Sequence, residues 1–196
     1  ELLQLPMAIF IYTLQGPLRI APLSIATALA NVETVAELLA MRCDVNPAGS
    51  VDSPLHYPAT FLMESSMEKA ELLIAIGPIN LNAHMTSMGP FGFFAVLCNL
   101  QLLYMGPPVL FSHGEAFCKL EFWNGMTPLS VAAFFGDQAL VRCLLQAGSD
   151  VTVSNSCGDL PEDLATAQPI IKLLSCWEVF HDRKRWVQRR SAFVQT

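Results

Sequence analysis

Charged residues are scarce in this chain. They make up 14% of its 196 residues, whereas hydrophobic residues make up 53%. This balance excludes an intrinsically disordered protein, which has the opposite composition, and it supplies enough apolar material for one substantial domain. Because the first residue is Glu rather than Met, we expect the chain to be a piece or a processed form of a longer protein.

Closely spaced metal ligands are missing as well. The six cysteines lie at least 14 residues apart, and the histidines, His56, His84, His113 and His181, occur in separate segments without a neighbouring Cys or acid pair at ligand spacing. This excludes the C-x-x-C pattern of zinc and redox sites. We predict no metal and no other cofactor. Scattered cysteines act as small buried hydrophobes, which favours a reducing compartment, the cytoplasm, although a disulfide of Cys43 with a distant partner stays open.

Catalytic motifs are also absent. The sequence contains no G-x-S-x-G elbow and no phosphate-binding glycine loop. Gly89-Pro90-Phe91-Gly92 does not fit such a loop, because Pro90 lacks a backbone donor and no Lys follows it. The acids Glu162 and Asp163 stand where a helix is expected to begin, a position that favours negative charge. We therefore predict that the protein is not an enzyme.

No run is long enough for a membrane helix. Residues 72–114 contain no Asp, Glu, Lys or Arg, but their most apolar part, residues 91–105, has 15 residues and ends before Gly106-Pro107-Pro108. A spanning helix needs about 20 apolar residues. The uncharged residues 2–15 are interrupted by Pro6 and lack the basic start of a signal peptide. We expect no membrane-spanning segment.

The charge that is present is divided unevenly. Residues 181–196 carry five cations and one acid, so that +4 of the net charge of −6 lies there and the other 180 residues carry −10. An acidic body repels phosphate, which argues against nucleic-acid binding by the main domain. In the tail, Leu173, Phe180, Val187 and Val194 recur every seven residues. This spacing predicts a basic amphipathic helix over residues 177–196. It either caps the domain or docks on an acidic partner or an anionic membrane surface.

A repeat is the main positive feature. Pro22-Leu23-Ser24-Ile25-Ala26 aligns with Pro128-Leu129-Ser130-Val131-Ala132, and over 25 positions without a gap both copies continue to a Leu-Leu pair and an Asp-Val pair. Weaker copies begin near Pro54, Pro90 and Pro161, so that successive prolines are 32, 36, 38 and 33 residues apart. A period near 33 indicates a stacked repeat protein.

The residue types suit two short helices in each unit. Proline in the first turn needs no donor and has a fixed φ that suits a helix, while small alanines allow the two helices to approach each other. The Leu-Leu pair supplies the buried stripe of the second helix, and Gly148 offers a left-handed exit from it. Asn124-Gly125 and Cys157-Gly158 predict tight turns between units.

Residues 124–165 resemble an ankyrin repeat at nearly every signature position, and residues 22–46 resemble one without the two glycines, since Ala30 and Arg42 stand in their places. Residues 53–120 are degenerate copies. The resemblance implies an all-α solenoid of stacked helix-turn-helix units with short hairpin tips. We expect an N-terminal segment over residues 1–20, which could end a preceding repeat, the repeat domain over residues 21–176 and the basic tail over residues 177–196.

The resemblance also implies a monomeric scaffold or adaptor that binds another protein through the hairpin tips and the concave helix face. His56 occupies a family position whose role is hydrogen bonding near the turn. The candidate partner-binding residues are aromatic, and the alternative is that they are core: Phe117, Phe122, Trp123, Phe134 and Phe135. Two other functions stay open. The chain could be a cytosolic regulatory domain of a larger membrane channel or enzyme, or an eroded sequence with little selected function.

Overall fold

The computed structural model describes residues 21–46, 52–60, 66–86 and 123–177. Within these ranges the chain is helical and contains no strand. The helices follow one another in pairs along the sequence: α2 (Pro22–Leu29), α3 (Val32–Ala40), α4 (His56–Thr60), α5 (Ser66–Ile76), α9 (Pro128–Phe135), α10 (Gln138–Ala147), α11 (Pro161–Leu164) and a final helical stretch at 168–177.

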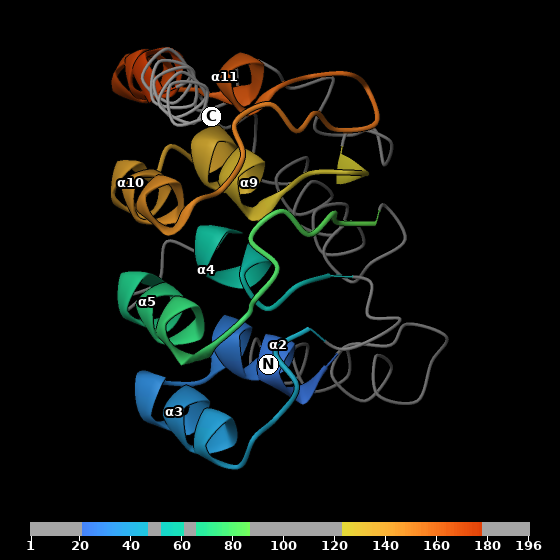
Figure 1. The fold of residues 1–196 in the computed structure, drawn as a ribbon, viewed down its shortest axis with the longest axis vertical. Helices are drawn as coiled ribbons and strands as arrows, with labels where there is room; N and C mark the ends of the chain where they lie inside the picture. The colour runs from blue at the N-terminus through green and yellow to red at the C-terminus, as the bar shows by residue number, and fades with distance from the viewer. Residues whose placement is uncertain (1–20, 47–51, 61–65, 87–122, 178–196) are drawn as a thin grey trace, which may run out of the picture.

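The pairs stack into a solenoid (Figure 1). We name them repeat 1 (residues 22–46), repeat 2 (54–86), repeat 3 (124–156) and repeat 4 (158–177). The first helices α2, α4, α9 and α11 form an inner row, and α3, α5 and α10 form an outer row that residues 168–177 continue. The predicted all-α solenoid is confirmed. Turns rather than strands make the tips of the described repeats.

Repeat 3 shows how the sequence produces one unit. The Thr127 hydroxyl caps α9 by accepting the Ser130 amide at 3.2 Å, and the Asp137 carboxylate caps α10 by accepting the Leu140 amide at 3.0 Å. Gly136 and Gly148 end the two helices with φ of 79° and 105°, values that glycine adopts without strain. Each boundary of the unit is therefore encoded locally.

Repeats 2 and 3 are direct neighbours in the stack. Helix α4 packs on α9, and α5 packs on α10. The Met85 amide donates to the Met126 carbonyl at 2.8 Å, and the Gly125 amide donates to the Met85 carbonyl at 2.7 Å. The degenerate copy predicted to begin near Pro90 falls within residues 87–122, which lie outside the described residues.

The core runs between the two rows of helices. In repeat 3 the Leu-Leu pair, Leu144 and Leu145, is buried as predicted, with exposed fractions of 0% and 1%. In repeat 1 Leu39 of the aligned pair is buried and Leu38 is partly buried against the same core. Ile170 and Leu174 of the final helical stretch join it as well. None of the helices in the described part of the chain is long and apolar enough to span a bilayer.

Candidate binding surface

Three of the aromatic residues predicted as partner contacts form a cluster at the C-terminal end of α9, where Phe134 and Phe135 lie and Trp123 packs on them. Phe134 meets Trp123 edge to face at 5.5 Å between ring centroids and Phe135 at 5.4 Å, and Trp123 stacks on Phe135 at 6.2 Å. Such pairs stabilise a cluster beyond the area they bury. Trp123 and Phe134 are 1% and 2% exposed, so among these three described residues only Phe135, which is half-buried, offers surface to a partner. Phe117 and Phe122 lie outside the described residues.

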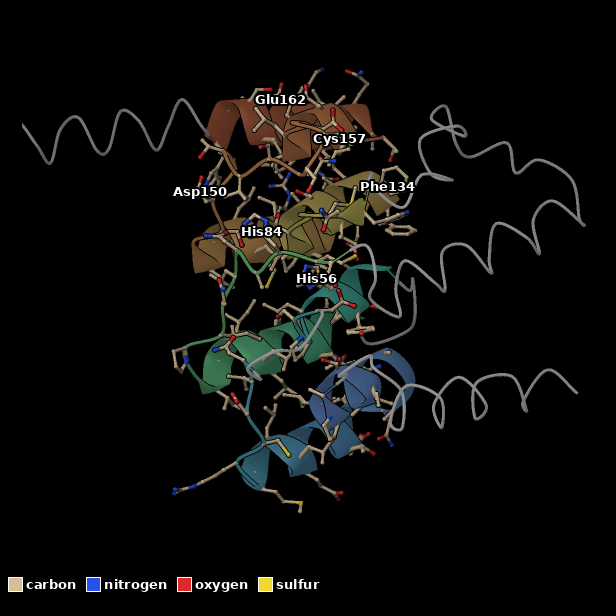
Figure 2. All side chains as sticks on the ribbon, turned by 90° about the vertical axis from the view of Figure 1, so that its right-hand side faces the viewer. His56, His84, Phe134, Asp150, Cys157 and Glu162 are labelled. Atoms are coloured by element: carbon tan, nitrogen blue, oxygen red, sulfur yellow. The ribbon has the colours of Figure 1, made fainter. Side chains whose placement is uncertain are left out.

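His56 joins repeats 2 and 3. Its Nδ1 accepts the Ser53 amide at 3.0 Å, because an amide can only donate. Its Nε2 therefore carries the proton and donates to the Met126 carbonyl at 3.1 Å. Burial lowers the pKa of His56 to about 4, although the hydrogen bonds with the backbone act to raise it. The side chain is a neutral structural link at the contact of α4 with α9 (Figure 2), and its predicted hydrogen-bonding role is confirmed.

A row of asparagine side chains joins the loops that follow the outer helices. The Asn46 carboxamide accepts the Asn80 amide of the next repeat at 2.8 Å. One layer further on, the Asn82 carboxamide accepts the Asp150 amide at 2.9 Å. Within each loop, Asp44, Asn80 or Asp150 in turn accepts the amide two residues later, at 2.9 to 3.1 Å. This regular pattern rigidifies the loop edge of the stack.

The tip between repeats 3 and 4 projects into solvent. The Asn155 side chain is buried and accepts the amides of Cys157 at 3.0 Å and Asp159 at 2.8 Å. Gly158 has a φ of 90°. Ser156, Cys157 and Gly158 are exposed, so this tip presents an ordered turn whose outer residues are accessible to a partner.

Comparisons with known proteins found one family match and a similar solved fold. Residues 124–156 match the ankyrin repeat family. The fold is similar to the ankyrin repeat domain of Bcl-3, a member of the IkappaB protein family, with a TM-score of 0.52 and 24% sequence identity over 78% of this chain. The match covers 50% of that structure, so the chain spans about half its length. No curated protein sequence matches the chain.

Residues 124–156 are an ankyrin repeat, and the stack has the ankyrin fold. The family match coincides with repeat 3, the unit with both helix caps and both left-handed glycines. The structural likeness extends the ankyrin fold to the neighbouring units. The ankyrin fold is a scaffold for protein–protein interaction.

Two groups of buried ionisable side chains, the pair Asp52 and Tyr57 and the single Lys69, were not predicted from the sequence. Asp52 is 3% exposed and accepts the Tyr57 hydroxyl at 3.4 Å. Burial raises the pKa of Asp52 to about 7, although hydrogen bonds from the Thr86 amide and Tyr57 oppose the shift. Burial also raises the pKa of Tyr57 well above its usual value, and the Asp52 carboxylate adds to this.

The second unpredicted group is Lys69, which is 3% exposed and donates from Nζ to the Thr27 carbonyl at 3.2 Å. Burial lowers the pKa of its ammonium group. Thr27 stands near the C-terminus of α2, where carbonyls lack helical partners and a cation is favoured. A spacing pattern could not reveal this contact, because Lys69 belongs to the next repeat. Among the described residues, no three His, Cys, Asp or Glu side chains are grouped so that they could hold a metal ion.

Proposed function

We propose that the chain is a non-enzymatic scaffold or adaptor in the cytoplasm, which binds another protein through its tips and concave helix face as a monomer. The ankyrin match over residues 124–156, set within a stack of similar helix pairs, carries the proposal. The four described cysteines, Cys43, Cys143, Cys157 and Cys176, are all free, which supports a reducing compartment.

The tip at residues 156–158 is the first contact that we assign to a partner. It combines exposure with order, since Asn155 fixes the turn through two backbone amides. An ordered loop loses less conformational entropy on binding than a loose one. Phe135 adds an aromatic group with accessible surface, and aromatic residues often dominate the binding energy of interfaces.

A matched pair of variants tests the proposal. Cys157 and Cys176 are both exposed, but Cys157 lies at the tip and Cys176 lies in the outer helical stretch 168–177. A partner captured with the full chain is re-measured against Cys157→Arg and Cys176→Arg. We expect Cys157→Arg to weaken binding at least about tenfold, the cost of one disrupted hot spot, and Cys176→Arg to leave it unchanged. Equal affinities of all three proteins would contradict binding through the tip.

A further inference from the structure

The two halves of the outer row of helices expose charges of opposite sign (Figure 1). On α3 and α5, the exposed charged side chains are all acids: Glu33, Glu37, Glu68 and Glu71. On α10 and the final helical stretch at 168–177, they are both cations: Arg142 and Lys172. The outer row is therefore acidic at repeats 1 and 2 and basic at repeats 3 and 4.

Exposed apolar side chains occur in the acidic half. Among the described residues, the large hydrophobic side chains that are exposed are Met41, at 75%, and Ile76, at 51%. Met41 directly follows α3 and Ile76 is the last residue of α5. These two helices pack on each other in neighbouring layers, and the loops that follow them are joined through the Asn46 side chain. Both apolar side chains therefore stand at the same end of the acidic half, as the members of an interaction patch do.

The acids and the apolar side chains share one side of each helix. In α3, Glu33, Glu37 and Met41 follow one another at intervals of four residues, and in α5 Glu68 and Ile76 are eight residues apart. Residues at multiples of four lie on the same side of a helix. Together they form one surface across the two helices, which we call the acidic outer face: Glu33, Glu37, Met41, Glu68, Glu71 and Ile76.

The stability of the helices does not account for all of these acids. Glu33 and Glu68 lie in the first turns of α3 and α5, where the helix dipole favours a negative charge. Glu37 lies in the last turn of α3, where the dipole disfavours one, and it repels Glu33 four residues before it. Glu71 in the same way repels Glu68 three residues before it. The second acid of each pair therefore favours a binding role over a structural one.

We propose that the acidic outer face binds a cationic amphipathic segment of a partner protein. Its acids attract Lys or Arg side chains, while Met41 and Ile76 contact apolar side chains of the same segment. Methionine suits this role, because its unbranched, polarisable side chain adapts to different apolar surfaces. Arg142 of the basic half, in the next layer, repels such a segment and restricts it to repeats 1 and 2.

The size of the acidic outer face favours a short segment over a second copy of the chain. Two neighbouring helices, each about 10 Å wide and about 15 Å long, offer a surface on the order of 300 Å². A stable interface between two folded proteins covers about 800 Å² on each side. The face also differs from the tips and the concave side to which the proposed function assigns a partner, so the inference goes beyond that function and does not depend on it.

Two peptides of opposite charge test the preference of the full chain. The probe is a fluorescent synthetic peptide of about 14 residues, four turns of a helix, with Leu on one side and Lys on the other. In the control peptide, Glu replaces every Lys. We expect fluorescence anisotropy to show saturable binding of the Lys peptide that weakens as salt is added, and no binding of the Glu peptide. Equal binding of both peptides, or no binding of the Lys peptide, would overturn the proposal.

Matched variants separate the acidic outer face from the net charge of the chain. Glu37→Gln combined with Glu71→Gln should weaken binding of the Lys peptide at least about threefold, the effect of two exposed ion pairs. Gln168→Lys combined with Cys176→Lys changes the net charge by the same amount at exposed positions of the basic half. This control should leave the affinity unchanged, because salt screens charges in distant layers. Equal losses in the two variants would mean that net charge alone attracts the peptide, and the proposal would fail.

The apolar contribution and the location of the peptide are measured next. Met41→Gln combined with Ile76→Gln should weaken binding at least about tenfold through lost apolar contact, with an unchanged circular dichroism spectrum, since both side chains are exposed. A photo-reactive group on the Lys peptide should cross-link the unaltered protein within residues 33–41 and 68–76. Unchanged affinity of this variant, or cross-links confined to other residues, would contradict the proposal. A dimer in sedimentation that this variant dissociates would also contradict it, because a second copy would then occupy the face.

Discussion

The two halves of the stack reach the same fold by different means. In the C-terminal half, repeat 3 encodes its boundaries locally, with Thr127 and Asp137 as caps and Gly136 and Gly148 as left-handed exits. In the N-terminal half, repeat 1 has Ala21 without a side-chain cap at the start of α2 and Arg42 in the left-handed region after α3, with a φ of 59°. The local signals for one helix start and one exit are therefore absent in repeat 1.

Contacts with repeat 2 compensate for the missing signals. Lys69 of repeat 2 donates to the Thr27 carbonyl near the C-terminal end of α2. The C-terminal end of α9 has no such lysine contact described and is terminated by Gly136. The Thr27 hydroxyl donates to the carbonyls of Leu23 and Ser24 and lies 3.3 Å from that of Pro54 in repeat 2. Repeat 1 thus depends on its neighbour, whereas repeat 3 specifies itself. In a solenoid, where stability is a sum of units and interfaces, this difference separates the strongest unit from a dependent one.

The largest expected effect comes from the core of the self-specified unit. Leu145→Ala removes a side chain that is 1% exposed and should lower the free energy of unfolding by roughly 2–5 kcal/mol. The aligned Leu39→Ala, in the dependent unit, should mainly increase hydrogen exchange within residues 22–46. Denaturant unfolding and hydrogen exchange measure the two effects. A loss below about 1 kcal/mol for Leu145→Ala would show that this site is not a packed core.

The next effect is the dependence of stability on pH, which should differ between repeats 2 and 3. The buried polar residues of repeat 3 are not ionisable: Thr127, Ser130, Ser149 and Asn155. In repeat 2, the pKa of His56 falls from 6.5 to about 4 on folding, and just before this repeat the pKa of Asp52 rises from 3.8 to about 7. Between these limits the unfolded state binds a proton on the histidine, and the folded state binds one on Asp52. Lowering the pH thus destabilises the fold through His56 and stabilises it through Asp52.

Variants separate the two opposing contributions. With Asp52→Asn, His56 acts alone, and stability should fall as the pH drops from 6.5 to 4, by at most about 1.4 kcal/mol per pH unit. With His56→Gln, Asp52 acts alone, and stability should rise as the pH drops from 7 towards 4. Denaturant unfolding at several pH values measures the slopes. Parallel slopes for both variants would rule out this pair as the origin of any pH dependence.

The sequence predicted the fold, because the period of about 33, the prolines and the Leu-Leu pairs directly determine helix pairs and their stacking. It also predicted the role of His56. The direct contact of repeat 2 with repeat 3 was not predictable. Pro90 lies 36 residues after Pro54 and 38 before Pro128, and this spacing does not indicate that the helices on either side pack on each other. The burial of Trp123 and Phe134 follows from packing that spacing does not encode, and so does the contact of Lys69 with Thr27.

A smaller effect is expected at the row of asparagines. Asn82→Ala removes the acceptor of the Asp150 amide between repeats 2 and 3 and should cost about 0.5–1.5 kcal/mol, the usual net value of one hydrogen bond. Asn46→Ala removes the corresponding acceptor of the Asn80 amide between repeats 1 and 2. If the array unfolds from its dependent end, Asn46→Ala should loosen repeat 1 in hydrogen exchange, whereas Asn82→Ala should lower the main transition. Reversed assignments would contradict the order of stability of the two halves.

The smallest expected effect comes from giving repeat 1 the glycine with which the second helix of repeat 3 ends. Arg42 is exposed and holds a left-handed backbone, where a side chain is strained and glycine is not. Gly148 occupies the aligned position with a φ of 105°. Arg42→Gly should therefore relieve strain in the folded state, but it also increases the freedom of the unfolded chain. We expect a net gain of up to about 1 kcal/mol, visible as slower hydrogen exchange in α3. The reverse change, Gly148→Arg, should destabilise repeat 3 by a similar or larger amount, because a side chain is strained in this left-handed backbone conformation. Steric contact would not contribute, since a Cβ at residue 148 meets no atom within 4 Å. Destabilisation by Arg42→Gly would mean that the arginine side chain contributes more than its strained backbone costs.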